Sequence, residues 1–252
     1  MLRLLLLTIS AAGLASAAAS PPIPPEDVEA RILAAGNDFR AENHLPPLAP
    51  NTTLAAEARD FAEYLARTGA FSHTADGRDP GQRAQAAGYD YCEIAENLVY
   101  GTDDSGFGID RLVRLFMDSW EASPGHRRNL LGPQSVETGV GVARAPGSPQ
   151  KYVAVQEFGR PAAMRYSFSI ANRSDQPVGY RFDGEHRRVA AYTTMVHSTC
   201  STDALVFDRD VAPDARPYPV RPDATYVVTP AERGMRIEIE GPPRARGRTP
   251  QQ

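Results

Sequence analysis

The chain has 252 residues, and it lacks features that are typical of several large protein classes. It contains two cysteines and a single lysine, and its 27 basic residues are outnumbered by 31 acidic residues, which gives a net charge of −4. Without an excess of basic residues, a protein has no surface that attracts a nucleic-acid backbone. Beyond the N-terminus, the chain also lacks a run of about eighteen apolar residues, which a membrane-spanning helix requires. The composition therefore disfavours nucleic-acid binding and transport across a membrane.

Several sequence motifs of enzymes are absent as well. The chain has no H-E-x-x-H motif of zinc proteases, no G-x-S-x-G motif of α/β-hydrolases and no phosphate-binding G-x-x-x-x-G-K loop. It also has no C-x-x-C pair, which argues against a thioredoxin-like or zinc-finger domain. A functional site must therefore be sought among polar residues that form none of these motifs.

The N-terminus has the pattern of a secretory signal peptide. A basic start at Arg3 precedes a leucine-rich stretch, and the small residues Ala15-Ser16-Ala17 follow it. We expect a signal peptide over residues 1–19, and a mature protein that is secreted or periplasmic and has no membrane span once the signal is cleaved. The alternative is an N-terminal membrane anchor, for which the apolar stretch is short.

The two cysteines, Cys92 and Cys200, can form a disulfide in an oxidising compartment. A bridge between them would enclose a loop of roughly 100 residues, for which the chain-entropy model gives about 4.7 kcal/mol of stabilisation as an upper guide. The alternative is two separate buried thiols, because an even number of cysteines does not prove that they pair.

Composition and hydrophobic periodicity divide the mature chain into successive segments. A proline-rich spacer (20–25) precedes a first domain (26–160), which is followed by a C-terminal β domain (161–241) and a tail that we expect to be disordered (242–252). In the first domain, apolar spacing and turn residues predict three long helices and then two strands. The expected elements are long helices over 26–42, 52–68 and from 109 to about 122, a short helix over 82–87, and strands over 140–143 and 153–158.

The C-terminal β domain shows the alternation of apolar and polar residues that is typical of strands. Short strands separated by turn clusters predict a small sandwich. The expected strands cover 166–171, 178–182, 189–196, 204–207, 225–228 and 235–239.

Polar residues gather near the ends of the predicted helices. His73 follows the second long helix and His126 follows the third, and Glu96 and Asn97 lie in a partly apolar stretch between them. Histidine titrates near neutral pH and often binds metals, and a carboxylate can orient an imidazole or accept its proton. These four residues are therefore the first candidates for a functional site.

Several segments of the first domain, in their order and spacing, are similar to those of one family. They are Asn37-Asp38-Phe39-Arg40, Phe71-Ser72-His73, Arg83 through Gly88-Tyr89, Ala95-Glu96-Asn97-Leu98, Trp120 followed by Ser123-Pro124-Gly125-His126-Arg127, and Glu137-Thr138-Gly139-Val140-Gly141. Through them the chain from about Ile32 to Gly159 resembles the CAP superfamily, also called the SCP/PR-1 or cysteine-rich secretory protein family, and looks most like its bacterial secreted branch. The resemblance does not extend to the C-terminal strands.

The resemblance implies an α-β-α sandwich, with helices on both faces of a small antiparallel sheet. The expected fold class is therefore α+β, a CAP-type sandwich followed by a small all-β, sandwich-like domain. It also implies a central cleft with two histidines and acidic residues, which bind zinc or another divalent ion in some members. His73 and His126 match the two histidines, and Glu96 matches the glutamate of the family's G-E-N motif, with Ala95 in place of glycine.

At one acidic position of the cleft, this sequence differs from the family pattern. A glutamate of many eukaryotic members corresponds to Ser123 here, and Glu121 and Glu137 are the candidates to replace it. Two imidazoles without a firm third ligand would hold zinc weakly and exchangeably. The alternative is that the histidines only form hydrogen bonds at the ends of loops. The residues expected to line the cavity are His73, Glu96, Asn97, His126 and Glu137.

Three functions are compatible with these features. The first is an extracytoplasmic binding protein whose cleft holds a divalent metal, such as zinc, or a lipid, cell-wall or protein ligand. The second is a metal-dependent hydrolase of peptide or glycan, with His73 and His126 on the metal and Glu96 as the catalytic base. The third is a non-catalytic structural protein of the cell envelope. Without a nucleophile motif or a complete ligand set, the sequence favours binding over catalysis.

Overall fold

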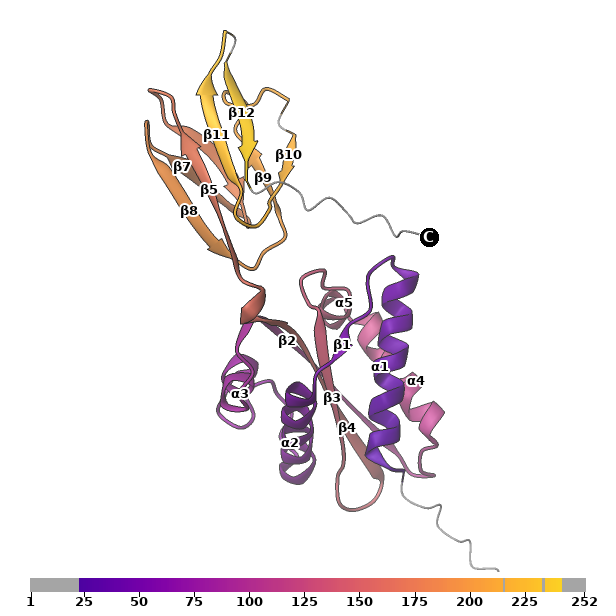
Figure 1. Cartoon of the computed structure of the whole chain (residues 1–252). Coiled ribbons are helices and arrows are strands. Elements are labelled where there is room, and N and C mark those ends of the chain that lie inside the picture. Colours follow the sequence, from indigo (N-terminus) through magenta and orange to yellow (C-terminus); the bar gives the residue numbers. More distant parts are fainter. Residues whose placement is uncertain (1–22, 215, 233, 242–252) are drawn as a thin grey trace, which may run out of the picture.

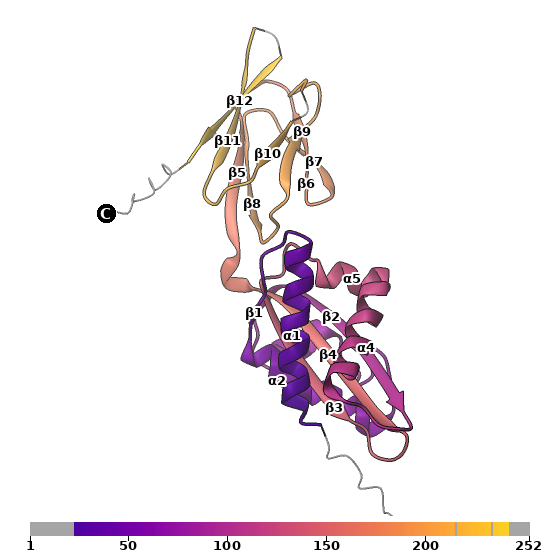
Figure 2. The same ribbon diagram turned by 90° about the vertical axis from the view of Figure 1, so that its right-hand side faces the viewer.

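The computed structural model describes residues 23–214, 216–232 and 234–241. The signal peptide predicted for residues 1–19, the first part of the proline-rich spacer and the predicted tail lie outside the described residues. The described chain contains both helices and sheets, and it confirms the α+β fold class. A first unit of helices around one sheet is followed by a second unit built of strands (Figures 1 and 2).

The first unit has one four-stranded sheet in the order β1-β3-β4-β2. The short strand β1 runs parallel to β3, and the other neighbours are antiparallel. The helices are α1 (Pro25–Glu42), α2 (Thr52–Thr68), α3 (Pro80–Ala86), α4 (Ile109–Ala122) and α5 (Pro124–Leu130), and the strands are β1 (Ala49–Pro50), β2 (Tyr91–Asp103), β3 (Glu137–Arg144) and β4 (Gln150–Pro161).

Helices cover both faces of this sheet, as the α-β-α sandwich requires. Figure 1 shows α2 and α3 on one side, and α1, α4 and α5 on the other. The apolar stripes of α1 and α4 pack with inward residues of β3 and β4 around the fully buried Trp120. On the opposite face, Ala58, Phe61 and Leu65 of α2 pack against Leu98 of β2 and the other side of β4. The sheet therefore separates two apolar layers.

The sequence explains both the ends of α2 and its close approach to the sheet. The side chain of Asn51 accepts hydrogen bonds from the first turn, and Gly69 ends the helix in the left-handed conformation with φ 75°. A Cβ atom on Gly139 or Gly141 of β3 would overlap the backbone of α2. These two glycines therefore let α2 lie directly on β3, and this contact brings Glu57 down to the sheet.

Three elements of the first unit were not expected from the sequence: the two-residue strand β1, the strand β2 and the helix α5. The strand β2 occupies a segment in which no strand was expected, because its polar Glu96 and Asn97 break the alternation that marks a half-buried strand. The helix that was expected to end near residue 122 does end there, but Pro124 then starts a further short helix that was not expected. Pro124 lies at the first position of α5, where a proline needs no hydrogen-bond donor. Of these elements, β2 and α5 carry residues of the predicted site.

The second unit is a sandwich of two four-stranded sheets, in the orders β10-β9-β6-β7 and β12-β11-β5-β8. Its core consists of inward-facing aromatic and aliphatic residues, including Phe168, Tyr180 and Tyr226. A short 3-10 helix (Ala162–Met164) leads into it from β4. The strands are β5 (Tyr166–Asn172), β6 (Val178–Phe182), β7 (Glu185–Val189), β8 (Thr194–Thr199), β9 (Ala204–Phe207), β10 (Pro217–Pro219), β11 (Thr225–Pro230) and β12 (Met235–Glu240).

The prediction of one continuous strand over residues 189–196 is wrong. One strand ends at Val189, a turn with Tyr192 at φ 55° follows, and the next strand begins at Thr194. The sequence gives no local signal for this turn, because residues 189–196 include no glycine or proline that would mark it.

Covalent and polar contacts join the two units beside the connecting segment. Cys92 of β2 and Cys200 after β8 form a disulfide with their Cα atoms 5.9 Å apart, which decides between the paired and separate cysteines. The amide of Thr202 also donates a hydrogen bond to the side chain of Gln134 at 3.2 Å. Among the described residues, no helix is long and apolar enough to cross a membrane.

Candidate functional site

The predicted site residues His73 and Glu96 lie in direct contact. His73 is in the loop after α2, and its Nδ1 atom lies 2.6 Å from Oε1 of Glu96 on β2. The side chain of Glu96 is only 1% exposed, whereas that of His73 is 51% exposed. The second carboxylate oxygen of Glu96 accepts a hydrogen bond from Nη2 of Arg83. A buried carboxylate therefore orients a solvent-exposed imidazole.

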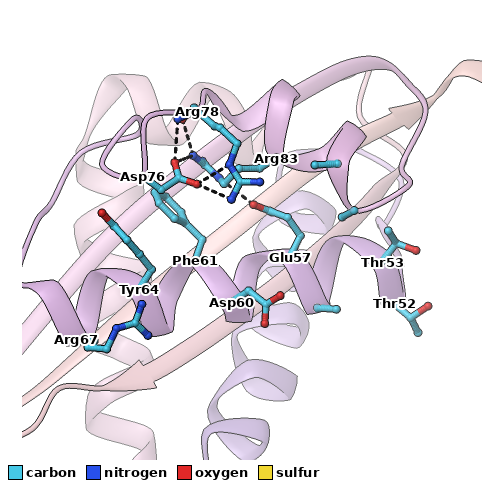
Figure 3. Close-up of a pocket in the computed structure, with 13 residues that line it drawn as sticks. Thr52, Thr53, Glu57, Asp60, Phe61, Tyr64, Arg67, Asp76, Arg78 and Arg83 are labelled. Atoms are coloured by element: carbon cyan, nitrogen blue, oxygen red, sulfur yellow. Dashed lines mark hydrogen bonds and ion pairs between the residues drawn. The ribbon is translucent and has the colours of Figure 1, made fainter.

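Arg83 of α3 joins this pair to α2 and to the loop after it. Its Nε donates to Oε1 of Glu57 at 2.9 Å, and its Nη1 donates to the backbone oxygens of His73 and Arg78 and to the side chain of Asp76. The guanidinium carbon lies 3.6 Å from the centre of the Phe61 ring. Figure 3 shows the Asp76 side of this network. With five donor contacts and a side chain that is 2% exposed, Arg83 fixes the loop that carries His73.

A third carboxyl group lies beside this pair. Glu157 of β4 is directly opposite Glu96 of β2 and is completely buried. Burial, and then the carboxyl groups of Glu96 and Glu57, raise the pKa of Glu157 well above its usual value. Burial also raises the pKa of Glu57 to about 7, although Arg83 opposes this shift.

Sequence reasoning did not identify Glu57 or Glu157 as site residues. A signal was nevertheless present, because each is a charged residue at a position that the apolar pattern places inside. Glu57 lies between Leu54 and Ala58 on the buried stripe of α2, and Glu157 interrupts the apolar run of β4. A charged residue is rarely buried without a partner, so its position in such a stripe predicts a polar cluster.

His126 reaches the same region from α5, at the edge strand of the sheet. Asn97 of β2 donates a hydrogen bond to the backbone oxygen of His126 at 3.1 Å. Asn129 of α5 donates to the backbone oxygen of Glu96 and to the side chain of Asn97. Burial and the charge of His73 lower the pKa of His126, so the two imidazoles are electrostatic neighbours. Asn97 therefore holds α5 against β2.

Neither of the two glutamates that could supply the missing acidic residue of the cleft, Glu137 and Glu121, lies in this network. Glu137 accepts hydrogen bonds from Tyr89 at 2.7 Å and from Asn51 at 3.1 Å. Glu121 lies on α4, where burial and the charge of Asp118 raise its pKa. In the described part of the chain, neither glutamate forms a hydrogen bond or ion pair with the two histidines or with Glu96.

The donor groups do not form a metal centre with three protein ligands. Within residues 23–214, 216–232 and 234–241, no group of three or more histidine, cysteine, aspartate or glutamate side chains is arranged to hold a metal ion. Both oxygens of Glu96 are already engaged by Arg83 and His73. The imidazoles of His73 and His126 remain, and two protein ligands are fewer than structural or catalytic zinc sites supply.

A groove of about 830 Å³ runs along α2 on the other side of Arg83 (Figure 3). Glu57 and Arg83 belong both to this groove and to the network behind it, whereas His73, Glu96 and His126 are not among its lining residues. The side chains that line it are Thr52, Thr53, Ala56, Glu57, Asp60, Phe61, Tyr64, Arg67, Asp76, Arg78, Arg83, Ala86 and Ala87. The predicted site residues and this groove are therefore separate surfaces, and the buried residues Glu57 and Arg83 lie between them.

Two exposed aromatic side chains lie in contact, one in the loop that carries His73 and the other on β2. Phe71, two residues before His73, meets Tyr100 of β2 edge to face, with the ring centres 4.9 Å apart. These side chains are 42% and 49% exposed. Lys151 places its ammonium 4.6 Å from the centre of the Tyr100 ring. Two exposed aromatic rings and a cation are thus grouped together, and the loop residue Phe71 links them in sequence to His73.

Comparison with protein families gives one match in this part of the chain. The model of the cysteine-rich secretory protein family, CAP, matches residues 33–158, which is half of the chain. The match includes all the candidate site residues and excludes the second unit. No curated protein sequence matches the chain.

Three bacterial proteins are among the solved structures that are similar to this chain. An outer surface protein from Borrelia burgdorferi has 21% identity and a TM-score of 0.47, over 55% of this chain and 96% of its own. An extracellular protein containing a SCP domain from Bacillus anthracis has 25% identity and a TM-score of 0.45, over 56% and 45%. A cysteine-rich secretory protein from Staphylococcus aureus has 22% identity and a TM-score of 0.40, over 56% and 40%. This chain therefore spans less than half of the last two.

Proposed function

Because the chain belongs to the cysteine-rich secretory protein (CAP) family, we propose that it is an extracytoplasmic binding protein that holds its ligand at the imidazoles of His73 and His126. The two histidines lie at the edge strand of the sheet, and His73 is half exposed there. A signal-peptide pattern at the N-terminus and the disulfide between Cys92 and Cys200 support a location outside the cytoplasm.

The observation that best supports this proposal is that both carboxylate oxygens of Glu96 are held by hydrogen bonds. One of its oxygens bonds to Nδ1 of His73 and the other to Arg83. A carboxylate at Nδ1 fixes the proton on that nitrogen and leaves Nε2 with a free lone pair. In the described part of the chain, Nε2 of His73 has no hydrogen-bond partner, so it can accept a bond from a ligand or coordinate a cation.

The same contacts argue against the hydrolase alternative. A general base must reach the proton that it removes, and it needs an oxygen that is free to do so. Glu96 is 1% exposed and would have to leave both Arg83 and His73 to activate a water molecule. Breaking a buried ion pair costs about 3–5 kcal/mol, so Glu96 acts as an orienting group rather than a base.

Two features narrow the chemistry of the ligand. Two imidazoles alone support only weak, exchangeable binding of a divalent cation such as zinc, with the remaining coordination positions open. The exposed pair of Phe71 and Tyr100 offers apolar surface, and Phe71 is only two residues before His73 in the same loop. We therefore favour a lipid, cell-wall or protein ligand that has a polar group for His73 and an apolar part for the two rings.

The proposal is tested on natively secreted protein in two steps. Mass spectrometry of the purified protein identifies metals and small molecules that are carried along with it. Calorimetry with zinc then compares the wild type with His73→Ala and His126→Ala, and both variants should lose most of the heat of binding. His44→Asn is the matched control, because in the described part of the chain the His44 side chain forms no hydrogen bond or ion pair with His73, Glu96 or His126, and its φ of 60° is one that asparagine tolerates.

Equal zinc binding by all variants, together with no copurifying ligand, would contradict a ligand site at these histidines. Turnover of a peptide or glycan substrate that disappears in Glu96→Gln would instead support the hydrolase.

A further inference from the structure

Three buried carboxyl groups share one guanidinium beneath the loop that carries His73. Glu96 and Glu157 are opposite each other on β2 and β4, and Glu57 reaches them from α2. The three residues are 5%, 0% and 6% exposed, respectively. Glu96 and Glu57 raise the pKa of Glu157 in addition to burial, and the cation that opposes them is Arg83.

Hydrogen-bond donors are too few for three carboxylates. Arg83 donates to one oxygen of Glu57 and to one of Glu96. No donor among the described residues reaches either side-chain oxygen of Glu157 or the second oxygen of Glu57. An isolated buried carboxylate is strongly disfavoured, and two ionised carboxylates in contact repel each other.

Glu157 and Glu96 form a directly opposed pair on the antiparallel strands β4 and β2, so their side chains project from the same face of the sheet. The Cβ atoms of such a pair lie about 4.5–5.5 Å apart, which allows the two carboxyl groups to approach within hydrogen-bonding distance. Two carboxyl groups form a hydrogen bond only when one of them carries a proton. Glu157 is the most deeply buried of the three and receives no bond from Arg83, so it is the group on which a proton costs least.

We propose that Glu157 is a neutral carboxylic acid in the folded protein, and that it positions Glu96 by donating a hydrogen bond to it. Arg83 and Glu157 then hold Glu96 from two directions, which aims its remaining oxygen at Nδ1 of His73. Glu157 is a positioning residue that acts through Glu96 and does not touch the ligand. Its effect on binding rests on the function proposed for His73, whereas its protonation does not.

Infrared spectroscopy tests the protonation directly. At mildly alkaline pH, above the pKa of about 7 of Glu57, the wild type should show the carbonyl band of a buried neutral carboxylic acid. Glu157→Gln should remove this band, because glutamine resembles the neutral acid in shape but has no carboxyl group. Glu137→Gln is the matched control and should keep the band, since Glu137 lies on the adjacent strand and accepts bonds from Tyr89 and Asn51.

A second measurement tests the positioning role. The nitrogen spectrum of the His73 ring reports which nitrogen carries the proton. Glu157→Gln can still donate a hydrogen bond to Glu96 and should keep the proton on Nδ1, whereas Glu157→Leu cannot donate and should give a mixture of both forms. A leucine that only disturbed packing would lower stability without changing this ratio.

Each outcome decides one part of the proposal. A wild-type spectrum without the acid band, or a band that survives in Glu157→Gln, overturns the protonation of Glu157, whether or not any variant is stable. An unchanged His73 ring in Glu157→Leu overturns the positioning role. A wild type that shows the acid band but binds no zinc and carries no ligand contradicts the proposed function instead, and leaves the neutral Glu157 intact.

Discussion

Nδ1 of His73 lies 2.6 Å from Oε1 of Glu96, and this contact joins an exposed imidazole to a buried ion-pair network. Because a carboxylate accepts the proton of Nδ1, the ring presents Nε2 to its surroundings as an acceptor. The contact depends on Arg83, which donates both to Glu96 and to the backbone of His73. The buried residues Arg83 and Glu96 therefore determine how the exposed imidazole of His73 is oriented, and the same two residues stabilise the fold around it.

Arg83→Met should be among the most destabilising single substitutions in the first unit. It removes the cation from Glu57, Glu96 and Glu157, and breaking a buried ion pair costs about 3–5 kcal/mol. Arg78→Met removes an arginine from the same loop, but its side chain is 53% exposed, so the cost should stay below about 1 kcal/mol. Denaturant unfolding measures both, and equal effects would show that the buried network does not carry the stability of this loop.

Gly141→Ala should destabilise the first unit by steric conflict. A Cβ atom there would overlap the backbone of α2 at Ala58 and Arg59, so the helix would have to move away from the sheet. Overpacking of this kind costs about 1–3 kcal/mol or more. Gly125→Ala is the control, because nothing lies within 4 Å of the added atom, and alanine is favoured in a helix by up to about 1 kcal/mol. Thermal unfolding of the two variants should therefore shift in opposite directions.

The second unit should lose stability in mild acid through His197. This buried imidazole stacks on Phe168 and accepts a hydrogen bond at Nδ1 from Arg187, so its proton is on Nε2, which faces Tyr180 at 2.7 Å. Burial, and then the charge of Arg187, lower the pKa of His197. The unfolded chain, with a pKa near 6.5, therefore binds the proton more tightly than the folded domain.

The sign of the pH effect follows from that difference. The contribution of His197 should be complete above about pH 6.5 and should fall as the pH decreases toward its lowered folded value. Denaturant unfolding, followed by NMR signals of the second unit, should show this loss in the wild type and a weaker loss in His197→Gln. His186→Gln is the control, since His186 lies at the surface beside Asp208. An identical pH slope in His197→Gln would exclude this origin.

Removing the disulfide should weaken the link between the two units. Cys92 and Cys200 are 108 positions apart, and native disulfides of this kind stabilise by about 2–5 kcal/mol. In the double variant Cys92→Ser/Cys200→Ser, we expect a lower unfolding temperature and faster proteolysis between β4 and β5. A variant with unchanged stability and protease resistance would mean that the remaining contacts hold the units together without the bridge.

The sequence predicted the elements that have strong local signals. The cap at Asn51, the apolar stripe of α2 and the stop at Gly69 suffice to define that helix, because each acts within one or two turns. The strand β2 could not be recognised in this way. Its Glu96 and Asn97 are polar because they serve the site, and only pairing with β4 makes the segment a strand.

The predicted site was incomplete for a related reason. His73, Glu96 and His126 were found because a histidine or a family motif marks each of them. Glu157 carries no such mark, and it meets Glu96 only through the register of two strands that are far apart in the sequence. For Glu137 and Glu121, the position in or near family motifs was the only guide. The side chain of Glu137 bonds to Tyr89 and Asn51, and Glu121 lies on α4.

The most direct test of the central claim is the nitrogen NMR spectrum of the His73 ring, recorded at mildly alkaline pH without and with zinc. If Glu96 orients His73 as a ligand-binding group, the neutral ring should carry its proton on Nδ1, and zinc should shift the Nε2 signal. The Glu96→Gln variant should lose the strong preference for this form. A wild-type ring with its proton on Nε2, or an Nε2 signal that zinc leaves unchanged, would contradict the claim.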